Sequence, residues 1–290
     1  MIAILPLLLA ATLNAGDVVV VPEPNLAFPI AQFYPAELLS SDGALKAMLP
    51  EAGESASADG LLHLAIGYGP VATYDSSLNV VQQRAIDGDI AAGASNRIYA
   101  AHEDRIDVYD ASGAIVQTLP APAGRDFRQV DVARCYVFAF GDEWLTRFDV
   151  CRGTNEEFHV RANAVHGLRD GGFIALLVSR IDVYDPSGAL LREIPSPPLQ
   201  SPQSIAFAED PHFVWLAGDG RVFKMRLSDG AVVASHPTGV IHDLTVIGEQ
   251  RPERAVSLAV ASNVSTLSSL ASFALFATLA IAAAIAVRNR

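Results

Sequence analysis

Strands of alternating apolar and polar residues recur along the chain, and each one ends at a polar turn. Five such segments are VATYD at residues 71–75, IDVYD at 106–110, LTRFD at 145–149, IDVYD at 181–185 and VFKMR at 222–226. A period of two is typical of strands that bury one face. Asp accepts hydrogen bonds from nearby backbone amides, and Gly adopts the positive φ that tight turns need. Five predicted turns follow these five strands, and a sixth precedes the first strand. The six turns are centred on Asp42-Gly43, Ser77-Leu78, Ser112-Gly113, Arg152-Gly153, Ser187-Gly188 and Asp229-Gly230.

Two of these units are near-copies of each other. Residues 105–120 (RIDVYDASGAIVQTLP) and 180–195 (RIDVYDPSGALLREIP) are identical at ten of sixteen positions and lie 75 residues apart. Successive turns are spaced by 35 to 42 residues. The near-copies are therefore two units apart, at about 37 residues per unit, which is typical of a four-stranded propeller blade.

Two further strands precede each alternating strand. The middle ones, LLHLAI, RIYAA, YVFAF, FIALLV and FVWLA, are apolar on both faces, as expected of central strands packed between sheets. The short segments before them, DIAA, QVDV, VHGL, SIAF and HDLTV, predict the innermost strands. We therefore predict an all-β chain that forms a β-propeller of four-stranded antiparallel blades. Six turns predict six blades, with residues 17–21 (DVVVV) closing the ring. Seven blades are the alternative if residues 28–50 contain more than one degenerate unit.

The repeat region also resembles a known family. The segment SIAFAEDPHFVWLAGDGRVFKM at residues 204–225 is similar to the repeats of NHL-type and related six-bladed propellers, and this diffuse similarity covers most of residues 16–250. The resemblance implies a site at the central axis, where some propellers of this kind use His or acidic residues to hold a metal ion.

Polar residues on the innermost strands are the candidate site, because these strands meet at the axis. They are Asp89, Gln129, Asp131, His166, His242 and Asp243. His166 and His242 occupy similar places in their repeats, as imidazole ligands of one divalent metal from different blades would. Such a metal activates water or polarises a carbonyl group. The alternative is that each His is a hydrogen-bonded structural residue.

The two chain ends predict export and membrane attachment. Residues 1–15 (MIAILPLLLAATLNA) are apolar and end in small residues, as a signal peptide does. Residues 16–250 are then the exported domain and residues 251–263 a linker. No charged residue occurs from 255 to 287, and residues 267–287 are long enough to cross a bilayer as a helix. The basic end places the C-terminus in the cytoplasm and the domain outside.

The last 27 residues resemble a sorting signal. They carry Ser265-Thr266-Leu267-Ser268, then an apolar stretch, then Arg288 and Arg290. This arrangement is similar to the bacterial protein-sorting tails of the IPTL-CTERM type. The resemblance implies recognition and removal by an exosortase-like membrane protease, which would release the domain. A plain type I membrane anchor is the alternative.

Charge and cysteine content narrow the partners and the compartment. The net charge of −12 argues against nucleic acid, because phosphates need basic groups for neutralisation. Cys135 and Cys151 are the only cysteines, and they lie opposite each other on a predicted hairpin that turns near Glu143. A disulfide is expected in an exported chain, and two buried free thiols are the alternative.

Three functions remain from the sequence, and the third, a purely structural envelope protein, is not separated from the first by sequence alone. The first is a surface-anchored, non-enzymatic binding module with no cofactor and with a protein or saccharide ligand, because a membrane tail and a repeat fold occur without a catalytic motif. The second is a metal-assisted hydrolase or lyase with its site in the central channel.

Overall fold

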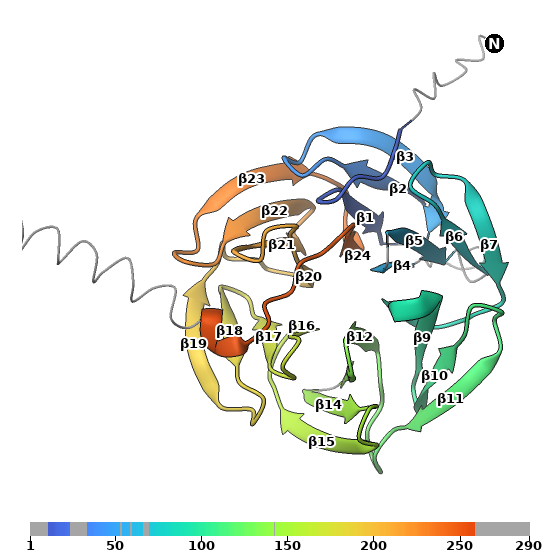
Figure 1. Ribbon diagram of the computed structural model, residues 1–290. Coiled ribbons are helices and arrows are strands. Elements are labelled where there is room, and N and C mark those ends of the chain that lie inside the picture. The colour runs from blue at the N-terminus through green and yellow to red at the C-terminus, as the bar shows by residue number, and fades with distance from the viewer. Residues whose placement is uncertain are drawn as a thin grey trace, which may run out of the picture.

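Six four-stranded antiparallel sheets stand around a central axis as the blades of a propeller (Figure 1). This is a computed structural model, and it describes residues 11–23, 34–52, 54–58, 60–65, 70–141 and 143–258. The predicted all-β propeller with six blades is confirmed. The ring closes on six blades, so the alternative of seven is wrong.

The blades are numbered from the first one that is continuous in sequence. Blade 1 contains β4 (Glu54–Ala58), β5 (Leu61–Ala65), β6 (Val71–Tyr74) and β7 (Val80–Arg84). Blade 2 contains β8 (Asp89–Gly93), β9 (Arg97–His102), β10 (Arg105–Tyr109) and β11 (Ile115–Pro120). Blade 3 contains β12 (Gln129–Ala133), β13 (Tyr136–Gly141), β14 (Trp144–Asp149) and β15 (Thr154–His159).

The second half of the ring repeats this order. Blade 4 contains β16 (Ala164–Gly167), β17 (Phe173–Leu176), β18 (Arg180–Tyr184) and β19 (Leu190–Pro195). Blade 5 contains β20 (Pro202–Phe207), β21 (Phe213–Gly218), β22 (Arg221–Arg226) and β23 (Val232–Pro237). Blade 6 contains β24 (Ile241–Val246), β1 (Val18–Pro22), β2 (Tyr34–Leu39) and β3 (Leu45–Ala52). A short 3-10 helix, η1 (Ala94–Asn96), links β8 to β9, and residues 255–258 form one helical turn.

Blade 6 joins the two ends of the chain. The N-terminal strand β1 pairs on one side with β2 and on the other with β24, where Val20 lies opposite Leu244. The valines of β1 are buried because they pack against the neighbouring blades, Val19 and Val21 against blade 1 and Val18 and Val20 against blade 5. The prediction that residues 17–21 close the ring is therefore confirmed.

The six predicted turns all join the third strand of a blade to its outermost strand, and we call them outer turns. Gly113 and Gly188, in the near-copies, have φ of 87° and 81°. Leu78 adopts φ of 60° at the equivalent place in blade 1. In blade 2, Asp110 Oδ1 accepts hydrogen bonds from the amides of Ser112 and Ala114 at 2.8 and 3.1 Å. The turn is thus stabilised by hydrogen bonds among its own residues, which explains why the sequence pattern at the turn predicts it.

One innermost strand was missed by the sequence analysis. Strand β4 has the sequence ESASA, which contains no large apolar residue. Ser55 and Ala56 are buried because they lie between blade 6 and blade 2, where small side chains fit close to the axis. A strand buried through small residues gives no hydrophobic signal.

Large apolar side chains fill the spaces between neighbouring blades. Between blades 2 and 3, Ile106 and Val108 pack in one cluster with Phe127 and Phe148. Trp215 of blade 5 lies, fully buried, in a cluster with Val18 and Leu39 of blade 6. Burial between sheets is the main stabilising contribution in this fold, at roughly 25 cal/mol per Å² of apolar surface.

Four of the six blade interfaces also carry a cation that reaches the next blade. In each case an Arg or Lys side chain donates to a carbonyl of the outer turn that follows, and we call this contact an inter-blade clasp. The four contacts are Arg84 Nη1 to Asp110 O at 3.3 Å, Arg147 Nη1 to Pro186 O at 2.7 Å, Arg192 Nη2 to Ser228 O at 2.7 Å and Lys224 Nζ to Ser41 O at 2.9 Å.

Removing one clasp is expected to weaken the propeller moderately. Arg192 donates to Ser228 O and to Leu258 O, so Arg192→Met leaves two carbonyls without their donor. The free energy of unfolding should fall by about 1–2 kcal/mol. Urea unfolding followed by circular dichroism measures this change. Arg97→Met, at an exposed position, is the control, and equal midpoints for the two variants would contradict the role of the clasp.

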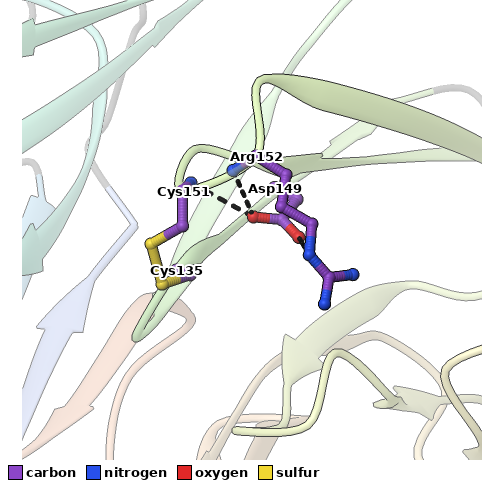
Figure 2. Close-up of a disulfide and its surroundings, with 4 residues drawn as sticks. All are labelled: Cys135, Asp149, Cys151 and Arg152. Atoms are coloured by element: carbon purple, nitrogen blue, oxygen red, sulfur yellow. Dashed lines mark hydrogen bonds and ion pairs between the residues drawn. A yellow bond between two sulfur atoms is a disulfide. The ribbon is translucent and has the colours of Figure 1, made fainter.

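A disulfide joins Cys135 to Cys151, as predicted. It connects the turn between β12 and β13 to the outer turn of blade 3, with the two Cα atoms 5.4 Å apart (Figure 2). The described residues contain no free cysteine.

The described chain ends lie on the face of the outer turns. The Leu13 amide donates to Ser76 O in the outer turn of blade 1, and the Leu13 side chain is buried. At the other end, Ala255 and Leu258 are buried against blades 4 and 5, and Figure 1 shows this orange-red segment leaving β24 and running to β18. Residues 13–15 and 251–258, predicted as parts of a signal peptide and a linker, therefore contact the propeller.

The predicted sorting tail at 264–290 and residues 1–10 lie outside the described residues. Within the described ranges, no helix has the length and apolar character needed to cross a membrane.

Candidate functional site: the central cavity

The innermost strands of all six blades surround one cavity of about 280 Å³ on the propeller axis. All six residues that the sequence analysis singled out line it: Asp89, Gln129, Asp131, His166, His242 and Asp243. The structure adds further polar residues to this lining: Ser55, Arg128, Gln203, Ser204, Thr245, Glu249 and Arg251. The cavity wall is therefore mainly polar.

Three of the predicted carboxylates connect one innermost strand to the next. Asp89 Oδ2 accepts from the Val130 amide at 2.6 Å. Asp131 Oδ2 accepts from the Gly167 amide at 2.7 Å. These bonds satisfy backbone amides that face the channel and have no strand partner there.

Asp243 makes the same type of bond across the ring closure. Its Oδ2 accepts from both the amide and the hydroxyl of Ser55, at 2.9 and 2.8 Å. Strands β24 and β4 come from opposite ends of the described chain, so this carboxylate helps to hold the first blade against the last.

Four ionisable residues form a cluster, which we call the charge cluster, at one end of the cavity: Asp131, His166, Glu249 and Arg251. Arg251 binds both oxygens of Asp131 through Nη1 and Nη2, each at 2.7 Å. Arg251 Nε also donates to Glu249 Oε2 at 3.0 Å. The His166 ring lies between the two carboxylates, with Nε2 bonded to Glu249 Oε1 and Nδ1 3.5 Å from Asp131 Oδ2. These side chains are only 10–15% exposed.

The pKa values in this cluster follow the balance between burial and charge. Burial alone raises the pKa of Asp131, but the guanidinium of Arg251 outweighs it, and with His166 it holds this pKa well below its usual value. Glu249 shows the same balance, and its pKa is also lowered. Burial alone lowers the pKa of Arg251, but the negative charges of Asp131 and Glu249 have the larger effect. The pKa of Arg251 is therefore raised above its usual value. Both carboxylates and the guanidinium are therefore charged at neutral pH.

This charge cluster closes the cavity at the ends of the innermost strands. Arg251 Nη1 lies 3.2 Å from the carbonyl oxygen of Gly167, the last residue of β16. Glu249 Oε1 accepts from the amide of Phe207, the last residue of β20. The chain that leaves β24 thus folds back under the axis. Sequence analysis missed Glu249 and Arg251 because they lie after the last repeat, where no blade pattern marks a position.

The opposite end of the cavity is open. Gln129 is the first residue of β12, and Gln203 and His242 are the second residues of β20 and β24. His242 is exposed and both glutamines are partly exposed. We call these three residues the cavity mouth. Amide and imidazole groups both donate and accept hydrogen bonds, so the mouth matches a polar ligand rather than an apolar one.

The residues present do not fit the predicted metal site. His166 lies in the charge cluster at the closed end, whereas His242 lies at the open end. Arg251 already occupies the carboxylate oxygens beside His166, and its positive charge disfavours a cation there. Over the ranges that the structure describes, no group of three or more His, Cys, Asp or Glu side chains is placed to hold a metal ion.

The fold and the cavity define a six-bladed β-propeller whose central channel is closed at one end by its own chain. No protein-family model matches the sequence, and no curated protein matches it. Among solved structures, a protein of unknown function from Bacteroides caccae is similar with a TM-score of 0.60 and 11% identity, over 79% of this chain and 98% of that chain.

Two further solved structures are similar. U3-55K matches with a TM-score of 0.53 and 12% identity, over 72% of this chain and 77% of that chain. BamB from Moraxella catarrhalis matches with a TM-score of 0.42 and 18% identity, over 73% of each chain. At these identities, the likeness to the first two structures concerns the fold alone.

Proposed function

We propose that this chain is an exported β-propeller, held at a membrane by its C-terminal segment, that binds a protein or saccharide ligand at the cavity mouth. The observation that carries the proposal is the asymmetry of the cavity. All six innermost strands contribute to it, one end is polar and open, and the other is closed by Glu249 and Arg251.

The positions of the chain ends support a displayed mouth. In a four-stranded antiparallel blade, the innermost strand and the third strand run in the same direction, so the outer turns share a face with the closed end of the cavity. Leu13 and Leu258 both contact this face, through Ser76 and through Arg192. An anchor that follows residue 258 would therefore hold the closed face toward the membrane and leave the mouth exposed on the other side.

Export is supported by the disulfide and by the sequence of both ends. Disulfides persist in oxidising compartments and are rare in the cytosol. The apolar N-terminus predicted as a signal peptide agrees with this assignment, but because Leu13 packs on the propeller, removal of the leader would have to occur before residue 13. The sorting tail predicted at 264–290 agrees as well. Removal of the tail by an exosortase-like protease would give a released form of the same binding module.

The ligand should be rich in hydroxyl or amide groups. Gln129, Gln203 and His242 offer donors and acceptors at the mouth, and Ser204 adds a hydroxyl group deeper in the cavity. A site built from paired donors and acceptors discriminates against ligands that leave those groups unpaired. Sugar rings and peptide ends both meet this requirement.

Binding to defined arrays tests the proposal. The full chain in detergent micelles is applied to printed mono- and disaccharides and to printed tetrapeptides, beside the variant Gln203→Leu. We expect retention of at least one class of probe, with about tenfold weaker binding by the variant, as the loss of a buried hydrogen-bonding group gives. Gln83→Leu, on the exposed outer strand β7, is the matched control. Absence of any retained probe, or equal binding by Gln203→Leu, would refute the site.

A further inference from the structure

The interface between blades 2 and 3 differs from the other five. Four interfaces carry an inter-blade clasp, and the interface from blade 6 to blade 1 has the Leu13 amide bonded to Ser76 O instead. Among the described residues, no Arg or Lys side chain of blade 2 donates to the outer turn of blade 3. The strand pairings show which positions changed. Val108 occupies the position of Arg147 in blade 3 and of Lys224 in blade 5. Gln117 occupies the position of Arg192 in blade 4. Leu119 occupies the position of Arg84 in blade 1.

A groove of about 470 Å³ lies at this interface. Gln117 and Leu119 of β11 form one wall, and Phe148, Asp149 and Val150 at the end of β14 form the other. The groove opens at the outside of the ring beside an outer turn. It occupies the place where a clasp side chain lies at four other interfaces.

The disulfide keeps this groove in shape without a clasp. In blade 4, Arg147 of the preceding blade binds both Gly171 O, in the turn between β16 and β17, and Pro186 O, in the outer turn. In blade 3 the same two turns are joined covalently by Cys135 and Cys151 (Figure 2). The turn is therefore fixed from within blade 3 and needs no cation from blade 2 to hold it.

We propose that the groove between blades 2 and 3 binds an arginine or lysine side chain of a protein partner. The four clasps are internal examples of the same chemistry: a cation enters between two blades and donates to the outer turn. The Asp149 carboxylate adds charge complementarity. Its Oδ1 holds the amides of Cys151 and Arg152, and its Oδ2 lies 3.7 Å from Arg152 Nε.

The surroundings favour a basic residue with apolar neighbours. The Arg152 side chain is 79% exposed, so an incoming guanidinium exchanges with one that is already in solvent. Ile115 and Val116, both more than half exposed, precede Gln117 on β11. The chain carries a net charge of −12, which attracts a basic segment over longer range. This interaction surface is separate from the cavity mouth and does not depend on the function proposed for it.

Photo-crosslinking of the full chain tests the groove. The probe is the tripeptide acetyl-photoleucine-arginine-isoleucine amide, and its partner probe has citrulline, which keeps the shape and loses the charge, in place of arginine. Crosslinks are mapped by mass spectrometry after trypsin digestion. We expect labelling in segments 106–125, 148–152 and 153–161, which contain the residues that line the groove. Labelling with citrulline should be at least about tenfold less, as the loss of a charge-assisted hydrogen bond gives.

Two variants complete the test. Gln117→Arg supplies the missing clasp from within the chain and should abolish labelling by the arginine probe. Val233→Arg adds the same charge at an exposed position on β23 and should leave labelling unchanged. Equal labelling by the two probes, or full labelling of Gln117→Arg, would overturn the proposal. The comparison of probes uses the wild-type chain, so it stands even if a variant folds poorly.

Discussion

Replacing Cys135 and Cys151 by alanine is expected to lower the free energy of unfolding by about 3 kcal/mol, the stabilisation associated with closing a loop of this length. The two cysteines are 16 residues apart. Most of the effect arises in the unfolded chain, which gains freedom when the loop is open. Urea unfolding of the wild type and the double variant, under oxidising conditions, measures the difference. Adding a reductant should shift only the wild type, and equal midpoints without the reductant would contradict the prediction.

A second substitution separates the contribution of the disulfide to the free energy of unfolding from the contribution of an inter-blade clasp. In the cysteine-free chain, Gln117→Arg places a guanidinium where Arg192 lies in blade 4, within reach of the outer turn of blade 3. We expect it to restore about 1 kcal/mol, the usual net contribution of a hydrogen bond. The same change in the wild type should give less, because the disulfide already holds the turn. A gain of equal size in both backgrounds would show that the two contacts act independently.

The sequence predicted those parts of the fold that depend on neighbouring residues. Asp110 and Gly113 hold an outer turn through contacts within five residues of one another, so the Asp-Ser-Gly pattern is sufficient to locate it. The near-copy at 180–195 then sets the repeat length. The ring closure was also predictable, because an unpaired apolar strand such as 17–21 needs a neighbour on each side.

The inter-blade clasps could not be predicted in this way. Arg84 reaches Asp110 over 26 residues and Arg147 reaches Pro186 over 39. The cation is on β7 in blade 1 and on β14 in blade 3, so it occupies no fixed place in the repeat. Only the folded ring shows that these arginines serve one purpose.

The candidate site was predicted in its position and only partly in its chemistry. Asp89 and Asp243 line the cavity as expected, because innermost strands meet at the axis. Their carboxylates bind backbone amides of the next strand, which a single repeat cannot reveal. Arg251 lies beyond the last blade, so its pairing with Asp131, 120 residues earlier, has no local signal. The metal hypothesis depended on free histidine and carboxylate groups, and this pairing removes the basis for it at the closed end.

The second large effect is expected from Arg251→Ala. The substitution leaves Asp131 and Glu249 buried together without their guanidinium partner. Removing one partner of a buried ion pair lowers the free energy of unfolding by about 3–5 kcal/mol, because the charge that remains keeps its desolvation penalty. Urea unfolding at pH 7 measures the loss. Arg251→Lys keeps the charge but not the two-pronged bond to Asp131, so it should fall between the variant and the wild type. A stability of Arg251→Ala within 1 kcal/mol of the wild type, the net value of about one hydrogen bond, would contradict the role of the cluster.

The pH dependence of this effect has a definite sign. The folded-state pKa values of Asp131 and Glu249 are lowered, so their contribution to stability is fully present above their unfolded-state values of about 4. It is lost as the pH falls below about 4 toward the lowered values. In Arg251→Ala the same carboxyl groups are buried without a cation, so they take up protons at higher pH than in the wild type. The stability difference between the two proteins should therefore be largest at pH 7 and shrink as the pH falls through the range in which the carboxyl groups are protonated in the variant but still ionised in the wild type. A difference independent of pH would mean that Arg251 stabilises the closed end by packing alone, and its charge would then have no part in sealing the cavity.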